Sequence, residues 1–437
     1  MSVGSVADRG SSGVNQIPVN RANEARRVLQ DPALVTSVVV LWVLLGLFVL
    51  YPLVWLLVRT FTEGGTLTLA NLLVILKDPN HRQSFWNSLL LAALVGVAGT
   101  VLGFFFAFTA VRANLSKAWG TVLDAACLLP LISPPFTTAI AMIFSFGPRG
   151  LITYHLLGIK GFTVYGLGST WFSETLTFFP IAYLTLKPIL GGIDPNVEDM
   201  AFSLGSSRWR VFRTVTLPLT VPGLANAFLL LFAASLADFA TPLILAGNQF
   251  PVLPTQAYLQ ITGLFDLKGG AVLSFVLLVP AMIVYLLQRY WVSRKSYVTI
   301  TGKVGAQTTV KSVAPWARIV LLVSCLLLAF VILYFYVLLF YASVVMALGA
   351  NHRFTLAHYH VIFTEGLKAI RDTLIIAGAG MPLGGLFGIL VGYLVTKKVF
   401  PGRQAMEVVS MVNYSLPGTI VGIAYLMAFN DPPIVLT

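Results

Sequence analysis

A polar segment interrupts the apolar body of this chain at residues 198–223. Two acidic residues open the segment, three arginines follow, and two prolines stand near its end. Asp194 and Pro195 predict a helix start, because Asp caps a first turn and Pro lacks only an N–H that this turn leaves unused. Such a segment lies on a membrane surface or docks its apolar side chains into a groove of a partner. We favour docking. No catalytic set of Ser, His and Asp or of paired carboxylates is visible in the sequence.

Histidines and cysteines give a weaker chemical signal. His352, His358 and His360 lie in one predicted outward loop, and a His-x-His pair can bind metal. Their spacing is short and no carboxylate is adjacent, so we predict no metal site and no cofactor. Cys127 and Cys325 lie inside apolar runs without a CxxC pattern and are expected to be small buried side chains.

Other residues interrupt apolar runs that are long enough to span a membrane. Asp238 lies well inside its run, where an ionisable group is costly and therefore a functional candidate. It either lines a path or holds the packing through a hydrogen bond, whereas Glu174 is expected at the membrane interface. Pro134-Pro135 and Pro417 should break or kink their helices, which is tolerated only against protein or a cavity. We therefore expect Pro134, Pro135, Asp238 and Pro417 near a path across the membrane.

The composition places the chain among multi-pass membrane proteins. Hydrophobic residues make up 57% of the chain, charged residues only 10%, and the mean hydropathy is +0.86. A soluble domain needs more charge on its surface. The net charge of +12 is explained by the preference of Lys and Arg for cytoplasmic loops. The expected surroundings are therefore the lipid bilayer, and nucleic-acid binding is excluded.

Nine runs are predicted to cross the hydrocarbon core, which takes about 20 apolar residues. Seven of them hold no charge and lie at 35–58, 84–111, 125–146, 269–288, 319–350, 373–396 and 408–430. Two weaker runs, near 168–186 and 223–246, contain the acidic residues Glu174 and Asp238.

The distribution of basic residues predicts the orientation of these spans. With the N-terminus inside, the inner segments hold 19 of the 28 Lys and Arg residues. These segments are 1–34, 112–120, 187–222, 289–318 and 397–404. The excess follows the positive-inside rule and places both the N-terminus and the polar segment in the cytoplasm.

Two parts of the chain resemble each other. Residues 87–112 match 372–397, and residues 124–152 match 407–435, at offsets of 285 and 283. The matched pairs are Gly99 with Gly384, Gly103 with Gly388, Arg112 with Lys397, Asp124 with Glu407 and Pro134 with Pro417. Six spans precede the second copy, so both copies share one orientation. Their glycines, with Gly392, form small-xxx-small patterns that predict close helix packing.

The predicted fold class is therefore all-α: a polytopic membrane protein with a tandem parallel repeat of six-span units, the second incomplete in this chain. The predicted parts are a cytoplasmic tail (1–34), a first unit (35–292) with its loop at 187–222, a linker (293–318), and the first three spans of the second unit (319–437). The counterpart of Glu198 would fall near residue 481, beyond Thr437. We therefore expect the chain to be truncated.

The polar segment resembles the EAA loop of permeases in ATP-binding-cassette (ABC) importers. That loop reads Glu-Ala-Ala, three residues, Gly, nine residues, Ile, one residue and Leu-Pro. The matching residues here, with the same spacing, are Asp199, Met200, Ala201, Gly205, Val215, Leu217 and Pro218, and Glu198 precedes them. Asp replaces Glu, Met replaces Ala and Val replaces Ile.

The resemblance implies a coupling helix that docks on ABC ATPase subunits, and an external substrate-binding protein that delivers the cargo. The chain is not expected to hydrolyse ATP or to be an enzyme. A P-loop needs G-x-x-x-x-G-K-[ST]. The only Gly-Lys pair, Gly302-Lys303, is followed by Val304, and Tyr297 takes the place of the first glycine.

The segments "LPLISPPFTTAIAMIFSFGPRGLIT" and "LADFATPLILAG" resemble the ferric-iron permeases, which fuse two such units in one chain. This resemblance implies a permease of the bacterial inner membrane with ferric iron as cargo. Permeases for polyamines, thiamine, sulfate or phosphonates have similar sequences and stay open as alternatives. An ion-coupled secondary transporter is disfavoured, because charge inside the spans is sparse and the repeat is parallel rather than inverted.

Overall fold

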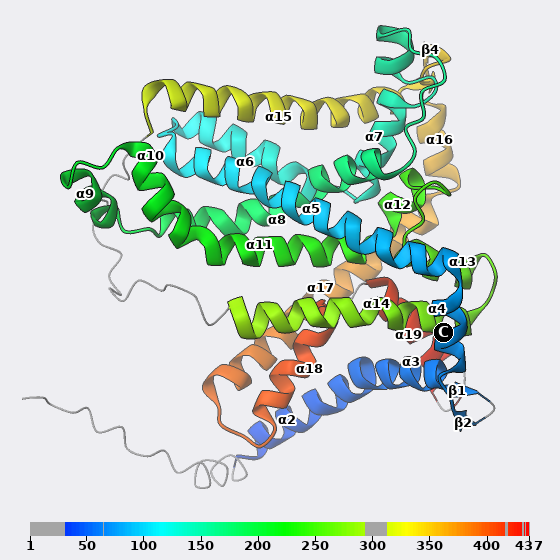
Figure 1. The fold of residues 1–437 in the computed structure, drawn as a ribbon. Helices are drawn as coiled ribbons and strands as arrows, with labels where there is room; N and C mark the ends of the chain where they lie inside the picture. Colours follow the sequence, from blue (N-terminus) through cyan, green and yellow to red (C-terminus); the bar gives the residue numbers. More distant parts are fainter. Residues whose placement is uncertain are drawn as a thin grey trace, which may run out of the picture. The chain divides into compact units, whose positions relative to one another are not determined.

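The computed structural model describes residues 31–63, 65–292, 313–415, 418–430, 432 and 434–436, and most of them are helical (Figure 1). Most of the predicted tail (1–34), most of the predicted linker (293–318) and Pro417 lie outside the described residues.

The helices are α2 (Pro32–Leu45), α3 (Tyr51–Phe61), α4 (Ala70–Lys77), α5 (Pro79–Arg112), α6 (Lys117–Ile132), α7 (Phe136–Phe146), α8 (Leu167–Gly191), α9 (Pro195–Ser203), α10 (Arg208–Val211), α11 (Leu217–Ala237), α12 (Ala240–Leu245), α13 (Leu253–Thr262), α14 (Leu267–Leu287), α15 (Pro315–Ser343), α16 (Ala357–Thr364), α17 (Leu367–Lys397), α18 (Arg403–Ser415) and α19 (Gly418–Phe429). Wider π-helical turns lie at Gly46–Leu50, Leu151–Leu156, Phe212–Thr216 and Gln288–Val292. Two short antiparallel hairpins pair β1 (Thr62–Glu63) with β2 (Thr66–Leu67) and β3 (Val345–Ala347) with β4 (Asn351–Phe354).

Within the described residues, six helices are long and apolar enough to cross a membrane, and two bent pairs raise the number to eight. The six are Pro32–Phe61, Pro79–Arg112, Arg208–Ala237, Leu267–Tyr290, Pro315–Ser343 and Leu367–Lys397. The bent pairs are Lys117–Ile132 with Phe136–Leu156 and Leu167–Gly191 with Pro195–Ser203. Eight of the nine predicted runs therefore have a helical counterpart.

Two predicted spans need correction. The run 408–430 is divided between α18 and α19, and only Ile420–Phe429 is an apolar helix, which is too short to cross alone. The polar residues of α18 explain this difference. The run 319–350 ends early, because α15 stops at Ser343 and the chain turns through the β3–β4 hairpin at Gly349, whose φ is +79°.

The chain separates into two compact units, residues 1–50 with 373–412, and residues 51–372 with 413–437. In the first unit, α2 carries Trp42, and Gly402 makes the turn between α17 and α18 with a φ of +84°. A Cβ on Gly402 would lie 3.5 Å from the Trp42 ring, so this turn packs against α2. These units divide the chain differently from the predicted six-span and three-span parts, whose bounds stay a prediction.

The second unit is built on α5, which lies side by side with α8 and α11 (Figure 1). Glycines allow the close approach. A Cβ on Gly103 would lie 2.5 Å from the Ala182 Cβ and 2.8 Å from the backbone N of Tyr183 on α8. A Cβ on Gly99 would overlap Leu231 of α11. The prediction of close packing is confirmed for these glycines. At Gly384, Gly388 and Gly392 the structure shows no such contact, because no described neighbouring atom lies within 4 Å of a Cβ placed there.

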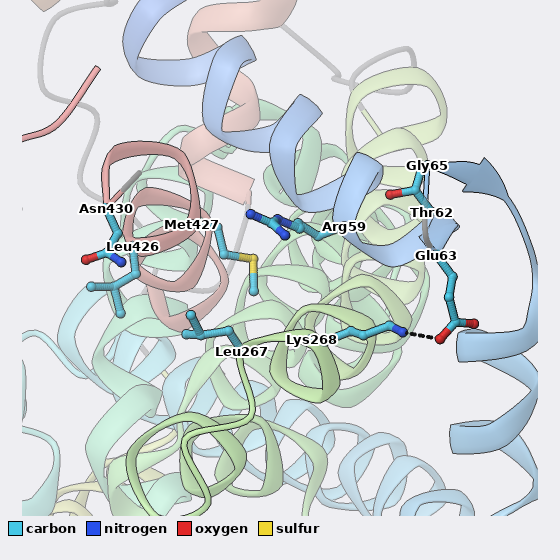
Figure 2. A pocket seen from close by; sticks show the side chains of 9 residues that line it. All are labelled: Arg59, Thr62, Glu63, Gly65, Leu267, Lys268, Leu426, Met427 and Asn430. Carbon is cyan, nitrogen blue, oxygen red and sulfur yellow. Dashed lines mark hydrogen bonds and ion pairs between the residues drawn. The ribbon is translucent and has the colours of Figure 1, made fainter. Parts of the chain in front are cut away.

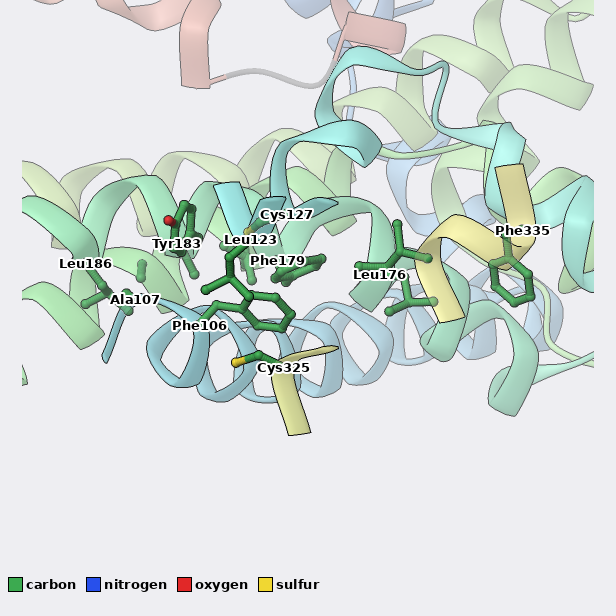
Figure 3. Packing of buried hydrophobic residues seen from close by; sticks show 14 of the residues in the cluster. Phe106, Ala107, Leu123, Cys127, Leu176, Phe179, Tyr183, Leu186, Cys325 and Phe335 are labelled. Atoms are coloured by element: carbon green, nitrogen blue, oxygen red, sulfur yellow. The ribbon is translucent and has the colours of Figure 1, made fainter. Parts of the chain in front are cut away.

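The main hydrophobic core joins these helices to α6 and α15 (Figure 3). Phe106 and Phe179 meet in it with ring centroids 5.3 Å apart. Both cysteines are buried there as free thiols, as predicted, and Cys325 donates to Thr109 over 3.4 Å. The helix α15 therefore packs on the first copy of the repeat rather than standing apart.

Helix ends fall at matching places in the two copies of the repeat. The first copy ends α5 at Arg112 and α6 at Ile132, and α7 ends at Phe146. The second copy ends α17 at Lys397 and α18 at Ser415, and α19 ends at Phe429. This agreement supports the tandem repeat, which stays an interpretation of the sequence.

The matched glycines give a stability test. We expect Gly103→Ala to destabilise the protein by about 1–3 kcal/mol, because the new methyl group has no room beside α8. Gly388→Ala should leave stability unchanged or raise it by about 0.5–1 kcal/mol, the usual gain from removing a helical glycine. The measurement is the thermal unfolding of the detergent-solubilised chain. Equal losses in both variants would contradict the close-packing assignment.

Candidate functional site

The predicted helix start at the polar segment is confirmed. Asp194 caps α9, and its carboxylate accepts from the backbone N of Asn196 at 2.9 Å. Pro195 takes the first helical position, where its missing N–H costs nothing. A short second helix, α10, follows, and its first turn is capped by Ser207, whose side chain accepts from the backbone N of Arg210 at 3.3 Å.

The turn after α9 depends on Gly205. Its φ is +80°, and its backbone N donates to Phe202 O at 2.9 Å. The next backbone N, of Ser206, donates to Ala201 O at 3.1 Å. This pair of hydrogen bonds is a Schellman cap, which needs a residue in the left-handed region and therefore favours glycine. The glycine of the EAA spacing thus ends α9 and turns the chain toward α10.

Glu198 points into the protein and anchors α9. Its Oε2 atom accepts from the guanidinium of Arg112, at the end of α5, over 2.6 Å, and the two side chains are only 5% and 4% exposed. Its Oε1 atom accepts from the Thr216 hydroxyl at 2.7 Å. One carboxylate therefore holds together α5, α9 and the turn before α11.

The opposite side of α9 is apolar and exposed. Val197, Met200 and Leu204 follow each other at three- and four-residue steps, which places them on one helical face. Leu204 is 87% exposed, and Trp209 of α10 is 69% exposed. Isolated apolar residues on a surface are ordinary, but several together on a polar segment mark an interaction site. We call these four residues the docking face.

The other residues of the EAA spacing take different roles. Met200 and Gly205 are exposed, Asp199 and Ala201 are half-buried, and Val215 and Leu217 are half-buried where α11 begins. Pro218 is exposed in the first turn of α11. Pro222 lies inside α11 and does not end the helix. The π-helical turn at Phe212–Thr216 widens the backbone just before them.

An aromatic stack gives the segment a second connection to α5. The Trp209 ring stacks on Phe212, with centroids 5.5 Å apart. The Phe212 ring also meets Phe108 of α5 edge-on at 5.5 Å. The docking face is therefore attached to α5 both by the Arg112–Glu198 ion pair and through this stack.

The predicted helix break at Pro134-Pro135 is confirmed. The chain bends by 100° between α6 and α7. A second break at Asp238 separates α11 from α12. The two breaks meet, because the Thr241 hydroxyl at the start of α12 donates to Pro135 O at 3.5 Å. Hydroxyl groups gather beside the first break, where Thr138 on α7 bonds Ser173 of α8 at 2.7 Å.

Two carboxyl groups are buried beside these breaks. Glu174 is fully buried, and its Oε2 atom accepts from the Ser235 hydroxyl of α11; its expected position at the membrane interface stays a prediction. The neighbouring helices enclose it because α8 is packed between α5 and α11. Asp238 is 8% exposed and caps α12, accepting from the backbone N of Ala240 at 2.9 Å. Both acids therefore lie in the interior of the helix bundle.

The three histidines that the sequence raised as metal ligands mostly bond the protein itself. His352 bonds the Tyr341 hydroxyl at 2.8 Å and accepts from the backbone N of Gly349 at 3.3 Å. His358 bonds Val345 O at 2.9 Å. Among the described residues, no three His, Cys, Asp or Glu side chains are grouped to hold a metal ion.

A pocket of about 590 Å³ lies away from these residues, between α3, α14 and α19 (Figure 2). Its lining includes Arg59, Glu63 and Lys268, and the Lys268 ammonium pairs with the Glu63 carboxylate at 2.7 Å. The guanidinium of Arg59 lies over the Trp55 ring at 5.4 Å. None of the predicted site residues lines this pocket.

Sequence reasoning missed Arg112 as the partner of Glu198, and it missed the docking face. A signal for each was present. Arg112 matches the basic residue Lys397 at the same helix end of the repeat, and the apolar residues of α9 recur at helical spacing. Glu174 gave no such signal, because its burial depends on helices far away in sequence.

Comparison with known families matches residues 99–297 to the binding-protein-dependent transport system inner membrane component. The chain is 30% identical to a putative ferric transport system permease protein of Haemophilus influenzae, over 94% of this chain and 66% of that protein. It is 31% identical to a ferric transport system permease protein of Actinobacillus pleuropneumoniae, over 93% of this chain and 60% of that protein. The chain thus spans less than two thirds of these two relatives.

A shorter relative is matched almost completely. The molybdenum transport system permease protein of Escherichia coli strain K12 is 32% identical over 51% of this chain and 97% of that protein. Among solved structures, a bacterial ABC transporter involved in the import of the polysaccharide alginate matches with a TM-score of 0.52 and 14% identity. This match covers 62% of this chain and 98% of the other, and it supports the fold alone.

The Arg112–Glu198 pair gives a direct test of the anchor. Glu198→Gln should destabilise the protein by about 3–5 kcal/mol, because it leaves a buried guanidinium without its counter-charge. The matched control is Asp124→Asn, which removes the partner of Lys187 at 2.6 Å in a half-exposed ion pair. That change should cost no more than about 1 kcal/mol. Thermal unfolding in detergent measures both.

Replacing both partners, with Arg112→Met and Glu198→Met together, should recover most of the loss, since two apolar side chains leave no charge unpaired. A Glu198→Gln variant as stable as Asp124→Asn would show that the pair does not anchor α9.

Proposed function

This chain belongs to the family of binding-protein-dependent transport system inner membrane components, and we propose that it is the permease subunit of an ABC importer. The observation that carries the proposal is the α9–α10 segment, which has one face anchored to the helix bundle by Glu198 and an apolar docking face turned outward. A helix of this kind is a common binding element for the groove of a soluble partner.

The proposed partner of the docking face is an ABC ATPase subunit. The exposed side chains of Arg208 and Arg210 flank this face and would add charged contacts at its rim. ATP hydrolysis is assigned to that separate subunit, because the sequence contains no P-loop. The excess of basic residues in the predicted inner segments supports a cytoplasmic position for the N-terminus and for the docking face.

Coupling follows from the two connections between the docking face and α5. When the ATPase subunits close, they move α9 and α10, and the Arg112–Glu198 pair together with the Phe212 stack moves α5. The helices α8 and α11 move with α5, because Gly99 and Gly103 pack them too tightly to slide separately. The breaks at Pro134-Pro135 and at Asp238 are the proposed joints beside the translocation path. Pro417, the expected counterpart in the second copy, lies outside the described residues.

The proposed cargo is ferric iron, delivered by an external binding protein. It rests on the names of the two long relatives, which match nearly the whole of this chain. The same importer class for polyamine, thiamine, sulfate or phosphonate is the alternative. An ion-coupled secondary transporter is the alternative of another class, and ATPase co-purification would separate it from an importer.

Uptake in cells that lack this gene tests the function. We expect uptake of labelled ferric iron to fall and to return when the full gene is restored, while uptake of labelled putrescine stays unchanged. Loss of putrescine uptake alone would keep the importer and replace the cargo. Unchanged uptake of both, together with no ATPase in the purified complex, would overturn the proposal.

Gly205 tests the docking face. We expect Gly205→Glu to abolish uptake without lowering the amount of protein in the membrane. A glutamate at this turn must adopt the left-handed conformation, which costs about 1–2 kcal/mol, and it adds a negative charge beside the docking face. Gly205→Asn should keep much of the uptake, since Asn tolerates this conformation. Radiolabelled uptake and membrane abundance are the measurements.

The matched control is Gly158→Glu. Gly158 also has a positive φ, +66°, and no described atom lies within 4 Å of its Cβ position. It lies outside the docking face, so this variant should transport normally. Wild-type uptake in Gly205→Glu would sink the assignment of the docking face.

A further inference from the structure

Glu174 and Asp238 are buried acids whose carboxyl groups the coupling scheme does not use. We propose that they form a cation-binding site beside the translocation path, and that they select a multivalent cation over an oxyanion. This inference rests on the proposed importer function and deepens it, because it assigns the charge of the cargo from residues of this chain.

Geometry places the two carboxyl groups together. Ser235, which donates to the Glu174 carboxylate, lies three residues before Asp238 on α11. Asp238 directly follows α11, and its backbone N donates to Ser235 O at 3.1 Å, so Ser235 contacts both Glu174 and Asp238.

Each acid keeps one oxygen atom available. Glu174 uses Oε2 for Ser235, and Asp238 uses Oδ1 for the backbone N atoms of Ala240 and Thr241. Glu174 Oε1 and Asp238 Oδ2 are buried and have no hydrogen-bond partner among the described residues. A buried polar atom without a hydrogen-bond partner costs free energy. On a buried acid inside a transporter, such an atom indicates a ligand that binds and is released.

Basic side chains do not neutralise the pair. No Lys, Arg or His of the described residues forms an ion pair with Glu174 or Asp238. The buried acid Glu198 on α9 differs in this respect, because it has Arg112 beside it. Two carboxylates in a protein interior are stable as charges only beside a cation. A cargo with several positive charges meets this requirement, and an anion would be repelled.

The neighbouring groups suit a hard cation. The Thr241 hydroxyl lies on α12 next to Asp238, and Pro135 O accepts from it at 3.5 Å at the break between α6 and α7. Carboxylate, hydroxyl and carbonyl oxygens are the ligands that hard cations prefer. Broken helices are also where transporters place their ion sites. The position is about 25 Å from the docking end of α8, at about 1.5 Å per residue.

The names of two relatives bear on the choice between a cation cargo and an oxyanion cargo. One long relative is named for ferric transport, whereas a half-length relative is named for molybdenum transport. Ferric iron is a small trivalent cation, and molybdenum and sulfur reach cells chiefly as oxyanions. Unneutralised carboxylates next to the path fit the first cargo and oppose the second.

The test is iron uptake by the complete importer, with its ATPase and binding protein, carrying Glu174→Gln or Asp238→Asn. Both variants keep the size and the hydrogen-bond acceptor of the side chain and remove its charge. We expect each to lower labelled iron uptake about tenfold or more, with normal membrane abundance. Stimulation of ATP hydrolysis by the loaded binding protein should persist, because the docking face is intact. Excess Ga³⁺, another hard trivalent cation, should compete with iron in the wild type, and molybdate should not.

Two control variants separate a cation site from a packing role. Ser235→Ala removes the hydrogen bond and keeps the Glu174 charge, so it should retain most of the iron uptake. Asp124→Asn removes a carboxylate that already has Lys187 as partner and should transport as the wild type does. Wild-type iron uptake in both Glu174→Gln and Asp238→Asn would overturn the inference, and so would a Ser235→Ala loss equal to that of Glu174→Gln.

The proposed function is contradicted by a different experimental result from the one that contradicts the cation site. If deletion of the gene leaves iron uptake unchanged, the iron importer is wrong whatever the variants do. If deletion instead abolishes molybdate or sulfate uptake, the importer class survives, but the cation selectivity of Glu174 and Asp238 is overturned.

Discussion

Arg112 and Glu198 form an ion pair in which both side chains are almost fully buried, and the placement of the α9–α10 segment depends on it. Such a pair contributes little net stability, because burying both charges costs about as much as their attraction returns. Its main effect is positional. The carboxylate of Glu198 is satisfied only where the end of α5 and the start of α11 meet, so α9 is held with its apolar face outward.

The close packing of α5 with α8 and α11 makes this anchor mechanically useful. Gly103 lets the backbone of α8 approach so closely that a single methyl group would collide with it. Interiors packed at this density transmit displacement rather than absorb it. A force on the docking face would therefore reach Glu174 and Asp238 along α8 and α11 without a flexible intermediate. The helix breaks at Pro135 and Asp238 then supply the places where the bundle can bend.

Several features followed from the sequence because they depend on neighbouring residues. The Asp194-Pro195 helix start and the break at Pro134-Pro135 each come from the backbone chemistry of one or two side chains. Most membrane-spanning helices followed from the length of apolar runs. The run 408–430 was the exception, since its polar first half forms α18 and leaves only a short apolar helix.

The sequence by itself determined that the chain is a helical membrane protein, where most of its helices begin and end, and that one polar segment carries the EAA spacing. Only the tertiary structure decided that Glu198 pairs with Arg112, that Glu174 is enclosed by neighbouring helices, and that Asp238 lies beside the break at Pro135. The reason is physical. Helix formation is governed by contacts within a few residues, whereas burial and ion pairing are decided by residues far apart along the chain, such as Arg112 and Glu198, which meet only when the helices pack.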